Sequence, residues 1–374
     1  MTDTQLIVTH FSLPEQVTRV TPLGEGFIND TYLVDTSEKQ QYILQRKNHT
    51  IFPNIPGMME NIYKVTSHIR EKGGTTFSLI PTKKGKWFHK ECTQAEVRGA
   101  TPGDNNATKE LCTYWVCFTF IPDTVSYEHA DSLELIRSGG EGVGMFHSLL
   151  ADFTEPLVDT LPGFHNISYR FDQFSRSVER AVGGIHRLEE VTAYIREIYE
   201  RKERMLAFWE LVENGTLPKR VSHNDTKLSN FLFDKNGHVV SAIDLDTVMS
   251  ATVLFDFGDA IRSYTNRFPE DHPQFDEVEM DPERFFTFSG GYLSKAAWFL
   301  NDMEKEHLAF SALYITYEQF LRFLMDYIDG DTYYRIRYPS HNLVRARTQW
   351  ALLKSMEAQY PIMQEIVTKI YNTL

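Results

Sequence analysis

The spacing of apolar residues changes once along this chain, and that change limits the folds it can adopt. Over roughly the first 120 residues, short runs with strand character alternate with turns, as in Thr31–Val34 and Tyr42–Leu44. Beyond that point, apolar residues recur at spacings of three and four, which is the pattern of helices that bury one face. The sequence therefore predicts an α+β chain in which an antiparallel sheet precedes a helical region.

One helix is expected inside the β-rich part. Its apolar face over residues 57–72 is formed by Met58, Ile62, Val65 and Ile69. The pair Gly73-Gly74 follows and ends this helix, because glycine readily adopts the conformation of a helix C-terminus. Further strand-like runs are FSLIPT, KGKWFH and YWVCFTFI.

Helices dominate the remainder of the chain. They are expected over residues 131–150, 169–183, 190–214, 305–329 and 341–371, with a strand-turn-strand segment over residues 221–245. At about 150 residues per domain as a soft prior, a chain of 374 residues forms two or three units. We divide it into a β-rich N-terminal lobe, residues 1–121, and an α-rich C-terminal lobe, residues 122–374.

Charge and apolar length exclude several kinds of partner. The 38 basic and 51 acidic residues give a net charge of −13, which repels nucleic acid and anionic lipid. The longest uncharged apolar stretch, Leu111–Pro122, is shorter than the roughly 20 residues that span a bilayer. No signal peptide is apparent at the N-terminus, so a cytoplasmic monomer or dimer without membrane or nucleic-acid partners is expected.

The three cysteines do not form a recognisable framework. These cysteines are Cys92, Cys112 and Cys117. Their number is odd, and their spacing matches neither a disulfide scaffold nor a zinc site. Reduced structural thiols are therefore expected.

The segment Val221–Phe233 carries the clearest chemical signal. It contains Asp225 and Asn230 in the pattern H-x-D-x-x-x-x-N, and Asp244 follows fourteen residues after Asn230 at the end of an apolar run. Phosphoryl transfer from ATP requires a carboxylate that orients the acceptor hydroxyl and takes its proton. It also requires oxygen ligands that hold Mg²⁺ against the phosphates. Asp225 fits the first role, and Asn230 and Asp244 fit the second.

Each of these residues also has an ordinary structural role open to it. Asp225 can cap a helix, Asn230 can lie in a turn and Asp244 can end a strand, and the pattern alone arises by chance. The conjunction of the loop, the spaced aspartate and an upstream glycine turn, Gly24–Gly26, favours catalysis. His223 is expected to hydrogen-bond the backbone near the loop rather than to act as the base.

These segments resemble the aminoglycoside phosphotransferase-like kinase superfamily. The resemblance lies in HNDTKLSN (His223–Asn230), IDLDT (Ile243–Thr247) and LFDFGDAIR (Leu254–Arg262). Within that superfamily the chain is most similar to the N-acetylhexosamine 1-kinases, which convert N-acetylglucosamine or N-acetylgalactosamine to the sugar 1-phosphate. Further matching pieces, between residue 24 and about residue 350, are Ile28–Tyr32, Leu44–Arg46, Met59–Ile62, Phe164–Asn166 and His341–Arg347.

The resemblance implies a fold and a set of roles. The fold is bilobal and protein-kinase-like, with a five-stranded N-lobe, a helical C-lobe and ATP bound between them. Asp225 is implied as the catalytic base, with Asn230 and Asp244 as Mg²⁺ ligands. The backbone near Phe120 is implied to bind adenine, and Asp256 to accept backbone hydrogen bonds from the catalytic loop.

The N-lobe is implied to contact the nucleotide. Gly24 and Gly26 let the backbone approach phosphates, although the third glycine of protein kinases is missing. Glu60 stands where a helix glutamate pairs with a basic residue on the third strand. The predicted strand contains no lysine, so Arg46 is the cation expected to bind phosphate oxygens. Either Arg46 or Gln45 points inward from this strand. For Glu60, an ordinary solvated helix position is the other interpretation.

The acceptor contacts are assigned to the C-lobe and the glycine turn. Arg322 lies on a mostly apolar helix and needs a partner, and Tyr333 follows nearby. A structural ion pair and a packed tyrosine are the alternatives. Phe27 stands where many related sugar kinases carry histidine, and it can only stack on a sugar. Asp246 and Asp259 are further candidates for support of the site or contact with the sugar.

The predicted activity is transfer of the γ-phosphate of ATP, with Mg²⁺, to the anomeric hydroxyl of an N-acetylhexosamine. The nearest alternative is the same fold acting on choline, homoserine, methylthioribose or an aminoglycoside. A cationic acceptor requires a carboxylate-rich pocket without an inward arginine, so the surroundings of Arg322 discriminate. A non-catalytic nucleotide-binding regulator is disfavoured because Asp225, Asn230 and Asp244 are all present. A protein kinase is disfavoured because no activation-segment motif lies between Asp244 and Asp256.

Overall fold

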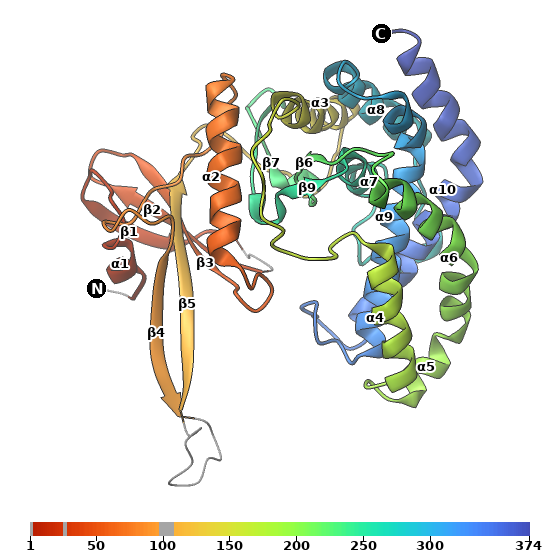
Figure 1. Cartoon of the computed structure of the whole chain (residues 1–374), viewed down its shortest axis with the longest axis horizontal. Coiled ribbons are helices and arrows are strands. Elements are labelled where there is room, and N and C mark those ends of the chain that lie inside the picture. The colour runs from red at the N-terminus through yellow and green to blue at the C-terminus, as the bar shows by residue number, and fades with distance from the viewer. Residues whose placement is uncertain (1–2, 25–27, 97–107) are drawn as a thin grey trace. The chain divides into compact units, whose positions relative to one another are not determined.

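The chain divides into two compact units, shown in Figure 1. The computed structural model describes residues 3–24, 28–96 and 108–374. The first unit comprises Met1–Pro122 with Leu157–Thr160, and the second comprises Asp123–Pro156 with Leu161–Leu374. The elements of the first unit are α1 (Asp3–Val8), β1 (Val17–Pro22), β2 (Asp30–Thr36), β3 (Gln41–Lys47), α2 (Ile55–Glu71), β4 (His89–Glu96) and β5 (Thr108–Thr119).

The first unit is built on a five-stranded antiparallel sheet in the order β1-β2-β3-β5-β4. This confirms the sheet predicted from the alternating apolar runs. Figure 1 draws α1 and α2 on opposite sides of it. Because side chains alternate along a strand, one face of β3 carries Tyr42 and Leu44, and the other carries Gln45 and Lys47. The face toward α1 is closed by a buried cluster of Ile7, Val8, Phe11, Val34, Tyr42, Leu44, Trp115 and Cys117.

Helix α2 forms where its apolar spacing predicts, with both ends fixed locally. The side chain of Asn54 accepts the backbone N–H of Gly57 at 3.0 Å, which satisfies one donor of the first turn. Gly73, with φ of 77°, lies just beyond the last turn. The buried side chain of Asn61 donates to the carbonyl of Val158 and accepts its N–H, both at 2.8 Å. This pair of bonds holds the segment Leu157–Thr160 to the first unit.

The expected strand over residues 77–82 is wrong. The segment forms only isolated β-bridges to other segments of the same chain, between Leu79 and Phe118 and between Thr82 and Phe11. The backbone N–H of Ile80 bonds to Cys117 at 2.8 Å, but the next residue, Pro81, has no N–H to continue the ladder.

The expectation of three reduced cysteines is also wrong. Cys92 on β4 and Cys112 on β5 form a disulfide, with their Cα atoms 4.1 Å apart. The register of the two antiparallel strands places these residues directly opposite each other. Sequence spacing could not reveal this pairing, because it depends on where the hairpin turns. Cys117 is a buried free thiol, and burial raises its pKa.

The second unit is largely helical. Its elements are α3 (Leu133–Leu149), α4 (Ile167–Arg180), α5 (Ile185–Glu190), α6 (Thr192–Glu213), β6 (Arg220–Ser222), β7 (Phe231–Phe233), β8 (Val239–Ala242), β9 (Met249–Ala251), α7 (Val253–Tyr264), α8 (Pro282–Ala296), α9 (Asp302–Ile328) and α10 (His341–Tyr371). The five helices predicted from apolar spacing are confirmed as α3, α4, α6, α9 and α10. Helix α9 is buried along most of its length, and the main core packs around it.

Two short antiparallel pairs hold the loops of interest. Strand β6 pairs with β9, and β7 pairs with β8 as a hairpin within the predicted strand-turn-strand segment. Helix α7, which the apolar pattern did not predict, follows β9 directly. These pairs bring the loop after β6 and the turn after β8 to the N-terminal end of α7.

Helices α3 and α8 approach closely through glycines, which leads to a stability prediction. A Cβ atom added to Gly291 would overlap the carbonyl oxygen of Arg137, whereas one added to Gly290 meets only Arg137 Nη1 at 3.7 Å. We expect Gly291→Ala to lower the free energy of unfolding by roughly 1–3 kcal/mol, because backbone must move. Gly290→Ala is the matched control and should be neutral or slightly stabilising. Urea unfolding of both variants checks this, and equal stabilities would contradict it.

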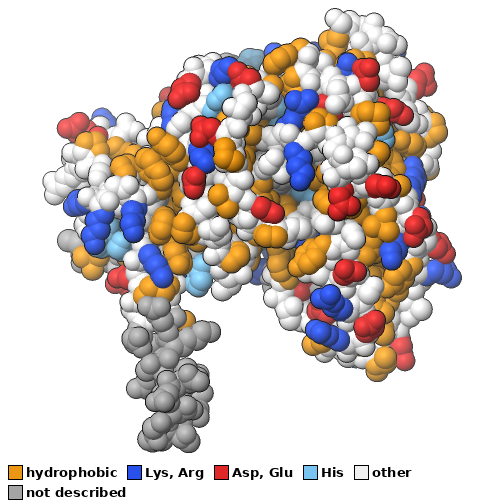
Figure 2. Space-filling view, in the orientation of Figure 1, with side chains coloured by type: hydrophobic (Ala, Val, Ile, Leu, Met, Phe, Trp, Pro, Cys, Tyr) orange, Lys and Arg blue, Asp and Glu red, His pale blue; other side chains and the backbone are white. Residues whose placement is uncertain are grey.

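The surface of the chain is mixed in charge on the face that Figure 2 shows. Acidic and basic side chains are interspersed there, so the net charge of −13 is not gathered into one patch on that face. Among the helices of the described residues, none combines the length and apolar character that crossing a membrane requires.

Candidate active site

The loop after β6 is fastened to the first turn of α7 by Asp256. One carboxylate oxygen of Asp256 accepts the backbone N–H of His223 at 2.7 Å, and the other accepts that of Asn224 at 2.6 Å. The hydroxyl of Thr226 donates to the backbone carbonyl of Asp256 at 2.6 Å. The predicted role of Asp256 as an acceptor for this loop is therefore confirmed. Asn224 has a φ of 64°, a conformation that these bonds maintain despite its cost.

Asp256 has a second partner that sequence reasoning missed. Nε2 of His147, on α3, lies 2.7 Å from the Asp256 carboxylate, and both side chains are fully buried. Nδ1 of the same ring lies 3.2 Å from the hydroxyl of Tyr292 on α8. The three residues come from three helices far apart in the sequence, and no local pattern marks His147. Together they form the buried support beneath the loop.

The turn after β8 is tied to the same loop. Nε2 of His223 lies 2.8 Å from the carbonyl of Ile243, which confirms the predicted backbone contact of that histidine. The N–H of Ile243 donates to the carbonyl of Asn230 at 2.9 Å. Thr247 adds a hydroxyl bond to the carbonyl of His223 at 2.7 Å. Asp244 therefore follows directly on residues bound to the loop, and its φ is 58°.

Asp225 lies at the centre of this arrangement. Nδ2 of Asn230 donates to the Asp225 carboxylate and to its backbone carbonyl, both at 2.8 Å. Nζ of Lys227 lies 3.2 Å from the same carboxylate. Burial by itself raises the pKa of Asp225, but Lys227, His223 and the bond from Asn230 outweigh it and bring the pKa below its usual range. These neighbours favour the ionised form of Asp225, which is the form that can accept a hydrogen bond from a hydroxyl.

Lys227, which sequence reasoning did not single out, lies directly beside Asp225. The negative charges of Asp225 first, and then of Asp244 and Asp259, raise the pKa of its ammonium above the usual range. Its signal was available, because it stands two residues after Asp225 within the same motif. A permanent positive charge at this place can stabilise negative charge that develops beside Asp225.

Asn230 and Asp244 fit a magnesium ion in their chemistry. Nδ2 of Asn230 is engaged by Asp225, so its amide oxygen is the atom available as a ligand. The carboxylate of Asp244 is close enough to Lys227 to raise the pKa of that lysine. An amide oxygen and a carboxylate are hard oxygen donors, and Mg²⁺ is usually held by few protein groups with water completing the shell.

Arg322 on α9 lies among aromatic rings. Its guanidinium carbon is 5.3 Å from the ring centre of Phe164, 5.8 Å from that of Tyr333 and 5.6 Å from that of Tyr334. Nη1 also donates to Gln319 at 3.4 Å. The structure therefore brings together Arg322 and Tyr333, the two residues of the second unit that are predicted to bind the acceptor substrate.

The turn that carries Tyr333 is held by the buried carboxylate of Asp326. Asp326 accepts the backbone N–H groups of Thr332 and Tyr333 at 2.8 Å and that of Tyr334 at 2.9 Å. Asn342, from the matching segment His341–Arg347, donates to the same carboxylate at 2.8 Å. Sequence reasoning did not identify Asp326, whose role depends on a turn that closes back onto its own helix.

Several residues of the first unit are predicted to contact the nucleotide. Gly24 has a φ of 69°, which suits glycine, whereas Gly26 and Phe27 lie outside the described residues. The N–H of Phe120 donates to the carbonyl of Gln41 at 3.2 Å, so the sheet already uses this donor. Binding of adenine by this backbone remains a prediction.

The predicted pairing of Glu60 with a basic strand residue needs correction. Arg46 is half-exposed and pairs with Asp30, and Glu60 pairs with Lys64 at 2.7 Å one turn along α2. The statement that the third strand has no lysine is also wrong, because β3 continues to Lys47. Lys47 is buried, and its Nζ donates to Gln45 at 2.7 Å on the face opposite Arg46. Gln45 and Arg46 were the two alternatives for the inward residue of this strand. Gln45, and not Arg46, lies on the same face of β3 as the buried Lys47.

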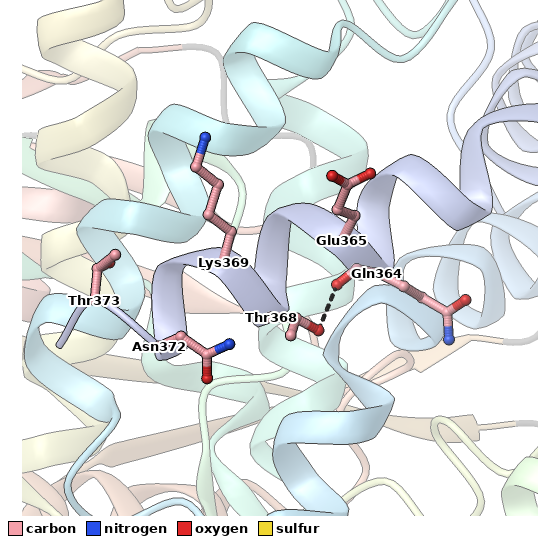
Figure 3. A pocket seen from close by; sticks show the side chains of 6 residues that line it. All are labelled: Gln364, Glu365, Thr368, Lys369, Asn372 and Thr373. Carbon is pink, nitrogen blue, oxygen red and sulfur yellow. Dashed lines mark hydrogen bonds between the residues drawn. The ribbon is translucent and has the colours of Figure 1, made fainter.

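A hollow on α10 is a different kind of surface. Figure 3 shows it lined by Gln364, Glu365, Thr368, Lys369, Asn372 and Thr373. All six side chains are exposed, four on the last turns of α10 and two just beyond its end, with a hydrogen bond of 2.9 Å from the hydroxyl of Thr368 to the carbonyl of Gln364. Such a surface cannot remove a ligand from water, so we do not assign it a catalytic role.

Comparison with solved structures finds this fold in other proteins. A microcompartment-associated aminopropanol kinase matches 96% of this chain and 98% of its own, with 18% identity and a TM-score of 0.59. An aminoglycoside phosphotransferase from Alicyclobacillus acidocaldarius matches 98% and 96%, with 14% identity and a TM-score of 0.60. A choline kinase from Streptococcus pneumoniae matches 92% and 94%, with 13% identity and a TM-score of 0.51. At such identities the likeness establishes the α+β fold.

The family follows from the sequence match. The model described as the phosphotransferase enzyme family, APH, matches residues 19–280, which is more than half of the chain and includes the whole loop from His223 to Asn230. The chain belongs to this phosphotransferase family.

Proposed function

We propose that this phosphotransferase transfers the γ-phosphate of ATP to the anomeric hydroxyl of an N-acetylhexosamine. The observation that carries the phosphoryl transfer is the ionised Asp225, held between Asn230 and Lys227 on a loop anchored by Asp256. The choice of acceptor is supported by the sequence resemblance and by the surroundings of Arg322.

The chemistry divides among these residues. Asp225 accepts a hydrogen bond from the acceptor hydroxyl and takes its proton as the new O–P bond forms. Lys227 lies beside it and offsets negative charge on the transferring group. Asn230 and Asp244 would hold Mg²⁺, which supplies charge neutralisation at the phosphates when bound. Most of the acceleration then comes from positioning and electrostatics.

The charges near Arg322 favour a neutral acceptor over a cationic one. The charges of Arg322 and Arg170 affect each other, and both guanidinium groups lie near one buried carboxylate, Glu318. Two guanidinium groups beside a single carboxylate repel a quaternary or primary ammonium group. An acceptor that carries an ammonium group, such as choline or aminopropanol, binds better where carboxylates outnumber guanidinium groups.

A coupled assay of ADP release with a panel of acceptors tests the proposal. N-acetylglucosamine or N-acetylgalactosamine should support turnover, whereas choline, homoserine and methylthioribose should not. The product should be non-reducing, and its phosphorus signal should couple to the anomeric proton. Absence of sugar-dependent turnover, or a product phosphorylated at another hydroxyl, would overturn the proposal.

The lowered pKa of Asp225 leads to a prediction on pH. Asp225 acts as an anion, so activity is lost as the pH falls through its pKa, which lies below the ordinary value of about 3.9. Lys227 is the largest of the effects that lower it. In Lys227→Met we expect the acid limb of kcat/KM to move to higher pH, because the cation that most lowers the pKa of Asp225 is gone. Lys235→Met, at an exposed position, is the control. An unmoved limb, with circular dichroism showing folded protein throughout, would contradict this.

A further inference from the structure

Asn224 makes hydrogen bonds with its side chain that the chemistry proposed above does not use. Its backbone N–H donates to Asp256 at 2.6 Å, which fastens the loop. Its Nδ2 donates to the carbonyl of Ser222 at 3.1 Å and to that of Thr247 at 2.8 Å. The residue is only 3% exposed. In such surroundings a hydrogen bond is electrostatically stronger than the same bond in water.

The orientation of this amide follows from its partners. Both contacts are to backbone carbonyl oxygens, which can only accept, so the group of Asn224 that faces them is the NH₂ donor. The other end, Oδ1, is buried and accepts no hydrogen bond from the described residues. The side chain is therefore held through its Nδ2 atom, on the side of Ser222 and Thr247.

The left-handed backbone of Asn224 does not by itself explain why an asparagine stands there. Its φ is 64°, which asparagine tolerates better than most residues. Glycine adopts the same conformation without steric cost. Glycine at this position would thus retain the backbone and lose the amide, so the two contributions can be measured separately.

Thr247 makes a second bond between the same two segments. Its hydroxyl donates to the carbonyl of His223 at 2.7 Å, while its own carbonyl accepts from Asn224 at 2.8 Å. Thr247 is buried as well. Because the two bonds run in opposite directions between neighbouring residues, a shift of one segment along the other strains both of them.

These bonds hold one side of the turn that carries Asp244. Asp244 directly precedes the 3₁₀ turn Leu245–Thr247. On its other side, Ile243 is bound to His223 and Asn230 of the loop, at 2.8 Å and 2.9 Å. Asp244 therefore lies between two points of attachment to the loop, one at Ile243 and one at Thr247.

We propose that Asn224 is a positioning residue, which fixes Asp244 relative to Asp225 through the carbonyl of Thr247. This inference rests on the proposed roles of Asp225 as base and of Asp244 as a Mg²⁺ ligand, and it does not depend on the acceptor. The path is short, since Asn224 precedes Asp225 in the chain and Thr247 lies three residues after Asp244. Groups that orient metal ligands typically contribute about 10- to 100-fold to metal affinity.

Two substitutions test the two bonds separately. Asn224→Gly removes both bonds of the amide and suits the φ of 64°. Thr247→Val keeps the backbone carbonyl and nearly the same side-chain shape, and it removes only the hydroxyl bond to His223. Asn372→Gly, at an exposed position just after α10, is the matched control.

The experiment measures the Kd of the full chain for ADP by isothermal titration calorimetry, over a range of Mg²⁺ concentrations and in EDTA. In the wild type and in Asn372→Gly, Mg²⁺ should tighten the binding of ADP. In Asn224→Gly the Mg²⁺ concentration that gives half of this effect should rise about tenfold, while the Kd without metal stays within about twofold. Thr247→Val should shift in the same direction by a smaller factor. Turnover should fall at limiting Mg²⁺ and recover at high Mg²⁺, with KM for the acceptor unchanged.

A merely structural role predicts a different result. The Asn224→Gly protein would then be less stable in thermal unfolding, but its folded fraction would respond to Mg²⁺ as the wild type does, and this would overturn the inference. Loss of ADP affinity by the same factor with and without Mg²⁺ would also overturn it. If Asn224→Gly does not fold, Thr247→Val decides, and an unchanged Mg²⁺ response in that variant contradicts the proposal.

The outcomes also separate this inference from the proposed function. A wild type that turns over no N-acetylhexosamine would overturn the proposed acceptor, and the titrations with ADP would still decide the role of Asn224. A wild type whose binding of ADP does not respond to Mg²⁺ would overturn both the metal role of Asp244 and this inference.

Discussion

Replacement of Asp225 by asparagine should lower kcat by roughly 10²- to 10⁴-fold, because the side chain keeps its shape but can no longer take a proton. The hydrogen bond from Asn230 and the anchoring of the loop by Asp256 do not depend on this charge. Nucleotide affinity and thermal stability should therefore stay close to those of the wild type. Single-turnover assays with the sugar and titration with ADP measure the two effects separately.

Asp172→Asn is the control for that experiment, since it removes the same charge from an exposed position on α4. It should retain full activity. If Asp225→Asn were as active as this control, Asp225 could not be the base, and the assignment of the loop would fail. If Asp225→Asn lost nucleotide binding instead, the residue would belong to the nucleotide site.

Replacement of Asp256 by alanine should have the largest effect on stability. The change leaves the N–H groups of His223 and Asn224 without their acceptor and removes the partner of buried His147. Breaking one side of a buried, hydrogen-bonded pair typically costs about 3–5 kcal/mol. We expect a loss of that size in the free energy of unfolding, together with loss of turnover.

Asp256→Asn and Asp276→Ala complete this test. Asparagine retains one acceptor oxygen, so Asp256→Asn should be intermediate in stability. Asp276 is exposed, and its removal should change the free energy of unfolding by less than about 0.5 kcal/mol. Urea denaturation measures the free energy of unfolding of all three variants. An Asp256→Ala variant as stable as Asp276→Ala would rule out the anchoring role of Asp256.

The loop from His223 to Asn230 could be predicted because its evidence is local. Asp225 and Asn230 belong to one short segment whose spacing reflects a chemical requirement, and His223 and Asp256 make the backbone bonds expected of them. The helices could also be predicted, because a buried face imposes a period on the sequence that does not depend on the partner element.

The support beneath the site could not be predicted, because its partners are distant. His147 lies 109 residues from Asp256, and Glu318 lies 153 residues from His165. Each of these residues is ordinary in its own helix, and only the packing of helices gives it a role. The same reason explains the error over the cysteines, since register alone brings Cys92 opposite Cys112.

The correction on the third strand has a different cause. Whether Lys47 counts as part of that strand depends on where β3 ends, and strand ends are poorly marked in a sequence. The predicted strand ended at Arg46, one residue short of the end of β3. Arg46 was therefore chosen as the basic residue of this strand in place of Lys47. Alternation along β3 would have assigned both Gln45 and Lys47 to one face once the end was known.

The turn held by Asp326 has a consequence for how acceptor preference can change over evolution. Its carboxylate accepts the backbone N–H groups of Tyr333 and Tyr334, so these bonds do not depend on which side chains stand at those two positions. Substitutions at Tyr333 and Tyr334 can therefore alter what faces Arg322 while the scaffold remains folded. Under the proposed role of this turn in binding the acceptor, a lineage that retains Asp326 and Asn342 could change its acceptor by substitutions at these two positions.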